Sequence, residues 1–160
     1  MNIERLIEIA EILETRSYTE QFDVGFNMAY VITPAAEPTH LGPLTNKEEH
    51  ECGTTCCIAG IAALRYRPEM FHKDYVIYDS VFISPLYGVV DIAEEVLGLD
   101  SETAESLFFP LDGIVAGSNI NWRDIKPETA AKVIRNLVAT GKVDWTTPVL
   151  EQIAETAPHL

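Results

Sequence analysis

His50-Glu-Cys-Gly-Thr-Thr-Cys-Cys-Ile-Ala-Gly60 is the stretch around which the rest of the chain is organised. It holds all three cysteines and one of the four histidines. An apolar run, Ile58 to Tyr66, follows directly, and this run is hydrophobic nearly all round when it is wound as a helix. Pro68 ends the run, because proline cannot continue a helix. The stretch therefore predicts a sharp bend at residues 50–60 that leads into a helix at the centre of the core.

The composition predicts one globular domain. With 160 residues and 47% apolar side chains, the chain is long enough to bury a hydrophobic core. The predicted domain covers residues 1–160. No run approaches the ~18 apolar residues of a membrane span, so we expect no contact with a membrane. The first residues lack the basic and apolar regions of a secretory signal. We therefore expect a cytoplasmic protein whose cysteines are thiols rather than disulfides.

The net charge limits the function. The 25 acidic and 11 basic side chains give a formal net charge of -14. A field of this sign repels phosphate backbones, which argues against ordinary direct binding of nucleic acids. Two interpretations stay open. The charge either keeps a solvated surface soluble or forms an acidic face that occupies the basic groove of a partner protein.

Apolar side chains recur at three- and four-residue steps in several segments, which is typical of amphipathic helices. Serine, aspartate, proline and glycine mark many of their ends. Six helices are predicted in this way. The first begins at residue 3 and ends between residues 15 and 17, the second covers residues 58–66, and the third begins at Pro85 and stops at Gly98. The fourth is capped by Asp100 or Ser101 and closed by Pro110, the fifth begins at Pro127 and ends at Gly141, and the last begins at Pro148.

Three segments mix aromatic and β-branched residues and are predicted to be extended: Phe26–Ile32, Tyr75–Tyr78 and Val81–Ile83. The last two flank Asp79-Ser80 and form either a hairpin or two separate extended pieces. Residues 33–49 are rich in proline and polar side chains, so we expect a long loop there, which is a candidate binding surface. The predicted fold is mainly α, with five or six helices and two or three short β-strands in a single compact α+β domain.

Cys52 is the candidate nucleophile of the cysteine-rich stretch. Free backbone N–H groups and the positive end of the dipole at a helix N-terminus favour a thiolate. His50, or His40 from the loop, would take the proton, and the amides of Thr54 to Cys56 would stabilise an oxyanion. The alternative is an inert, packed thiol. This interpretation is strongest for Cys57, which leads directly into the apolar helix.

A metal site is not predicted. A structural zinc site has four ligands, usually in two spaced pairs, whereas the three cysteines and His50 are crowded into one short stretch. The chain also lacks a Gly-x-Ser-x-Gly elbow and a glycine-rich phosphate loop. We therefore expect neither a metal nor another cofactor.

The combination of Phe26-Asn27-Met28 with Cys52-Gly-Thr-Thr-Cys-Cys-Ile-Ala-Gly60 resembles an uncharacterised family of small bacterial and bacteriophage proteins. The resemblance extends to Leu97-Gly98-Leu99, Ala104, Leu107-Phe-Phe-Pro110 and Pro127-Glu-Thr-Ala-Ala131. It implies no established reaction. The chain departs from the family's pattern in its proline-rich insertion, in Ile61, which replaces a tryptophan, and in Cys56, where relatives often have histidine.

The main functional prediction is a non-enzymatic, strongly acidic interaction protein of phage or mobile-element type. Its expected partner is a host protein with a basic surface, and the expected effect is inhibition of a nucleic-acid-handling or defence protein by charge mimicry. The alternative is a cysteine-dependent hydrolase or transferase that uses Cys52 with His50.

Overall fold

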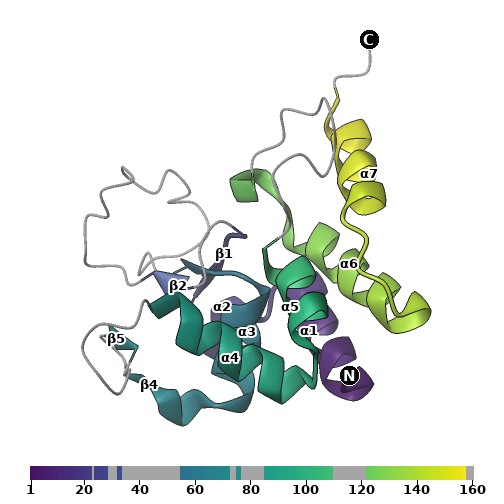
Figure 1. The fold of residues 1–160 in the computed structure, drawn as a ribbon. Helices are drawn as coiled ribbons and strands as arrows, with labels where there is room; N and C mark the ends of the chain where they lie inside the picture. Colours follow the sequence, from purple (N-terminus) through teal and green to yellow (C-terminus); the bar gives the residue numbers. More distant parts are fainter. Residues whose placement is uncertain are drawn as a thin grey trace.

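The helices dominate the structure (Figure 1). A computed structural model describes residues 1–22, 24–28, 32–33, 55–72, 75–76, 85–109 and 122–157. The α-helices of these residues are α1 (Ile3–Thr15), α2 (Tyr18–Phe22), α3 (Ile58–Tyr66), α4 (Pro85–Leu97), α5 (Ser101–Phe108), α6 (Pro127–Thr140) and α7 (Thr146–Thr156). The prediction of a mainly helical fold is confirmed, and the short helix α2 is an addition to it. Among these helices, none has both the length and the apolar character needed to cross a membrane.

The first helix and the sixth form the main helix pair of the core. The buried side of α1 consists of Leu6, Ile9, Ala10, Ile12 and Leu13. The facing side of α6 is likewise apolar, because alanine, valine, isoleucine and leucine recur there at helical spacing. The predicted stop of α6 is confirmed, since Gly141 follows the helix in the left-handed conformation.

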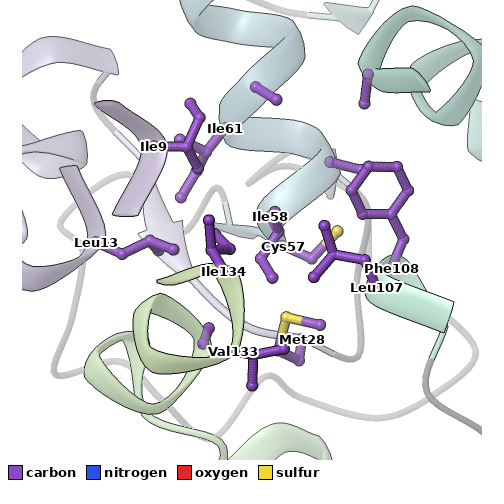
Figure 2. Close-up of a cluster of buried hydrophobic side chains, with 14 of the residues drawn as sticks. Ile9, Leu13, Met28, Cys57, Ile58, Ile61, Leu107, Phe108, Val133 and Ile134 are labelled. Atoms are coloured by element: carbon purple, nitrogen blue, oxygen red, sulfur yellow. The ribbon is translucent and has the colours of Figure 1, made fainter. Parts of the chain in front are cut away.

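The third helix is buried on nearly all sides, as its sequence predicted. Ile58, Ala59, Ile61, Ala62 and Ala63 each have 0% exposure. The helix packs mainly against α4 and also contacts α1 and α2. Figure 2 shows side chains of α1, α3, α5 and α6 converging on one apolar cluster around its first turn. This helix is therefore the centre of the hydrophobic core.

The extended structure is limited to two-residue pairings in the described residues. The strands β1 (Gly25–Phe26), β3 (Thr55–Cys56) and β2 (Ile32–Thr33) lie side by side in this order. The β1–β3 pair is parallel and the β2–β3 pair is antiparallel. A separate antiparallel pair joins β4 (Phe71–His72) and β5 (Tyr75–Val76).

These pairings correct one prediction and leave others open. Residues 26–32 are not one strand: β1 ends at Phe26, Met28 lies in a turn, and β2 begins at Ile32. The two or three regular strands stay a prediction, as does the single domain over residues 1–160. The predicted extended segment Val81–Ile83 and residues 34–49 of the predicted loop lie outside the described residues.

The corner between α4 and α5 is formed by a glycine and a capping aspartate, and it contacts the start of the chain. Gly98 has φ +60, so glycine ends α4 as predicted. A Cβ atom at this position would lie 3.4 Å from the backbone nitrogen of Asn2. That nitrogen donates a hydrogen bond to the Leu97 carbonyl at 2.7 Å. Asp100 then caps α5 by accepting from the backbone N–H of Thr103 at 2.8 Å.

The last helix supplies the cap that the N-terminus of α6 lacks. The N-cap residue of α6 is Lys126, which has no side-chain acceptor. Instead, the buried amide oxygen of Gln152 on α7 accepts from the Lys126 backbone N–H at 3.0 Å and from the Thr129 hydroxyl. The Gln152 amide nitrogen donates to the Asp124 carbonyl at 2.7 Å. One side chain thus satisfies three polar groups and docks α7 onto α6.

We expect Gln152→Ala to destabilise the protein by about 2 kcal/mol, because it leaves partly buried polar groups without partners. The measurement is urea unfolding followed by circular dichroism. Glu155→Ala is the control, since it shortens a side chain of similar size at an exposed position of the same helix, where only a 3.9 Å contact with Lys132 is lost. Equal midpoints for the two variants would contradict this role of Gln152.

Candidate functional site

The strand pairing brings together two sequence elements that are far apart in the chain. In the β1–β3 pair, Phe26 lies opposite Cys56. The next backbone N–H, that of Asn27, donates to the Cys56 carbonyl at 2.9 Å. The thiol of Cys56 lies 3.8 Å from the Gly25 carbonyl, which accepts its weak hydrogen bond. The Phe-Asn-Met element therefore lies directly beside the end of the cysteine-rich stretch.

The two described cysteines are buried thiols. Cys56 and Cys57 are 0% and 1% exposed, and both are free of disulfides. Burial raises the pKa of Cys56 well above its ordinary value, and the neighbouring Cys57 raises it further. Burial also raises the pKa of Cys57, although the backbone N–H groups of Gly60 and Ala59 at the start of α3 oppose this shift. Both directions favour the protonated thiol over the reactive thiolate at neutral pH.

Figure 2 shows Cys57 in the apolar cluster with Ile58, Leu107 and Phe108. The sulfur fills space in this cluster, as a small apolar side chain would. The predicted packing of Cys57 is confirmed, and its inertness stays a prediction. The helix N-terminus was predicted to favour a thiolate. At Cys57 this effect is outweighed, because removal from water destabilises the thiolate more than the backbone N–H groups stabilise it.

The residues predicted for catalysis are not brought together in the described structure. Cys52, His50, His40 and Thr54 all lie outside the described residues. Thr55 and Cys56, predicted as parts of an oxyanion hole, instead form the central strand β3, which pairs with β1 on one side and β2 on the other. The cysteine-dependent reaction therefore stays a prediction that rests on Cys52.

A metal centre is also not assembled by the part of the chain that is described. Within it, no group of three or more histidine, cysteine, aspartate or glutamate side chains is arranged to hold a metal ion. The described cysteines could contribute only as thiolates, and their burial disfavours that form.

The basic side chains of α3 and α6, and Arg16 directly after α1, are engaged in ion pairs. Arg135 of α6 contacts Glu14 of α1 through two nitrogens, at 2.6 and 2.7 Å. Arg16, which follows α1, contacts Glu128 at 2.8 Å. Two further pairs complete the set: Arg65 donates to Glu8 at 2.7 Å, and Lys132 lies 2.9 Å from Glu151 of α7. The acidic side chains on this part of the surface are thus partly neutralised from within the protein.

A half-buried tyrosine joins one of these pairs. The Tyr66 hydroxyl of α3 donates to Glu8 of α1 at 2.6 Å, and the guanidinium of Arg5 lies 4.6 Å from the centre of the tyrosine ring. Burial and then the hydrogen bond to Glu8 raise the pKa of Tyr66. No contact was predicted for Glu8 from the sequence. Its partner was missed because the contact joins residues far apart in the chain.

The helices α4 and α5 differ from the rest of the surface in charge. From Pro85 to Phe109 the sequence has six carboxylates and no lysine or arginine. We call these side chains the α4–α5 acidic surface: Asp91, Glu94, Glu95, Asp100, Glu102 and Glu105. All are exposed except Glu94, which is half-buried. Figure 1 shows the two helices side by side, and they pack together at their shared corner.

Little in the described structure neutralises this surface. Arg67 lies 3.6 Å from Glu95, but it is closer to Glu69, at 2.6 Å. Asp100 uses its carboxylate to cap α5. Within the described residues, the remaining carboxylates of the acidic surface form no ion pair or hydrogen bond: Asp91, Glu94, Glu102 and Glu105. This is the strongest uncompensated charge on the described helices.

Comparison with known proteins finds no family model, no curated protein and no solved structure that matches this chain. The resemblance to small bacterial and bacteriophage proteins therefore stays a prediction. The choice among the candidate sites therefore depends on the contacts and charges of the described residues. These favour the α4–α5 acidic surface.

We expect Cys56 and Cys57 to react with iodoacetamide more than about 100-fold more slowly in the folded protein than in denaturant, because their exposure requires opening of the core. Peptide mass spectrometry after a time course at neutral pH measures each cysteine separately. Rapid labelling of either thiol in the folded protein would contradict its burial. The same spectra test whether Cys52 is reactive. Labelling of Cys52 faster than that of an ordinary cysteine would support its role as a nucleophile.

The Glu14–Arg135 pair predicts a defined dependence of stability on pH. The hydrogen bond from Arg135 holds the pKa of Glu14 below its ordinary value. A carboxyl whose pKa is depressed by folding stabilises the protein above its unfolded-state pKa, and this contribution is lost as pH falls through the folded-state pKa.

We therefore expect Glu14→Gln to lower the unfolding free energy at neutral pH by at most about 1 kcal/mol, since the pair is partly exposed. The difference from the original protein should disappear on acidification. Urea unfolding at a series of pH values measures it, and Glu4→Gln, at an exposed position of the same helix, is the control. A constant difference at all pH values would show that the pair is not its cause.

Proposed function

We propose that this protein is a non-catalytic interaction protein that binds a basic protein surface through the α4–α5 acidic surface. The observation that carries the proposal is the combination of six carboxylates with the absence of any lysine or arginine from Pro85 to Phe109. Elsewhere in the described residues, several of the protein's own arginines and lysines pair with its carboxylates, among them Arg16, Lys132 and Arg135. On α4 and α5 the matching positive charge is supplied by a partner.

Electrostatic complementarity explains how such a surface works. Negative charge on a fixed helical scaffold attracts lysine and arginine side chains over roughly the Debye length, about 8–10 Å at physiological salt. This attraction mainly increases the rate of association and selects against acidic partners. The helices are held in place by the buried side chains of Val89, Ala93, Leu97, Leu107 and Phe108. The carboxylates are therefore presented by a framework that is already ordered.

The partner class that fits this surface best is a nucleic-acid-handling protein. Such proteins carry grooves lined with lysine and arginine, which contact phosphates. An acidic helical surface can occupy the same groove and exclude the nucleic acid. We include in the proposal that the protein comes from a phage or mobile element and acts on a host protein of this class. This part rests on the net charge of -14 and on the resemblance described above.

The first test uses a fluorescently labelled arginine-rich peptide as the basic probe. We expect the combined variant Asp91→Asn, Glu94→Gln, Glu102→Gln and Glu105→Gln to bind the peptide about tenfold more weakly, because four uncompensated charges are removed. Fluorescence anisotropy at low salt measures the dissociation constant. Binding of the unchanged protein should also weaken as salt is added.

The control changes the same net charge at other exposed positions: Glu4→Gln, Glu11→Gln, Glu20→Gln and Glu155→Gln. We expect this variant to bind within about twofold of the unchanged protein, because its charges lie outside the proposed surface. Equal weakening in both variants would mean that only the total charge matters, and the α4–α5 surface would lose its role. No binding of the peptide by the unchanged protein would refute the proposed function.

The second test addresses charge mimicry. A basic helix-turn-helix domain is bound to labelled duplex DNA, and the protein is added in increasing amounts. We expect the unchanged protein to release the DNA and the variant without the four carboxylates to release markedly less, because the acidic surface competes for the same basic groove. DNA that stays bound under conditions in which the peptide binds would exclude mimicry while leaving a basic partner in place.

A further inference from the structure

We draw no further inference here: the strongest candidate, the carboxylate cluster on α4 and α5, belongs to the surface already proposed, and within the described residues nothing besides its charge points to a second ligand.

Discussion

The burial of α3 is the constraint on which the rest of the structure depends. Alanine and glycine dominate this helix, and such small side chains allow neighbouring elements to approach its backbone closely. Its isoleucines then fill the space between α1, α5 and α6 (Figure 2). A helix that is buried on nearly all sides must be covered from several directions. The arrangement of α1, α2 and α4 around it follows from that need.

This constraint also decides the chemistry of the two described cysteines. Cys56 and Cys57 connect β3 to α3, so they enter the core together with the helix. A helix N-terminus favours a thiolate only where water or a counter-charge also supports it, and neither is available at these sulfurs. The start of α3 therefore packs these two thiols instead of activating them. Asn27, which is 4% exposed, lies in the same buried junction and links β1 to the Cys56 carbonyl through its backbone.

The distribution of charge gives the molecule two unlike surfaces. Around α1, α3, α6 and α7, ion pairs connect helices and reduce the net field, although each exposed pair contributes at most about 1 kcal/mol to stability. Among the residues that the structure describes, the α4–α5 acidic surface has no such partner beyond the long Arg67–Glu95 contact. Its carboxylates repel one another in the isolated protein, and a basic partner would relieve that repulsion. The proposed function thus follows from which carboxylates are paired with arginine or lysine, and not from the total charge.

The sequence by itself determined what depends on neighbouring residues. The spacing of apolar side chains indicated most of the helices, Gly98 and Gly141 marked two of their ends, and the continuous apolar character of Ile58–Tyr66 indicated its burial. The absence of cations from α4 and α5 was also readable from the sequence, although its meaning depends on which carboxylates are paired elsewhere.

Only the tertiary structure decided the contacts between distant residues. The β1–β3 pair, the Tyr66–Glu8 hydrogen bond and the capping of α6 by Gln152 each join segments whose local sequence carries no signal of the other. Short strands of two residues leave no periodicity to detect. Ion pairs likewise depend on which helix faces meet, and burial of the apolar sides decides how the helices are oriented. Local sequence patterns specify the individual helices. The burial of α3 and the packing of α1 against α6 decide which of these helices contact one another.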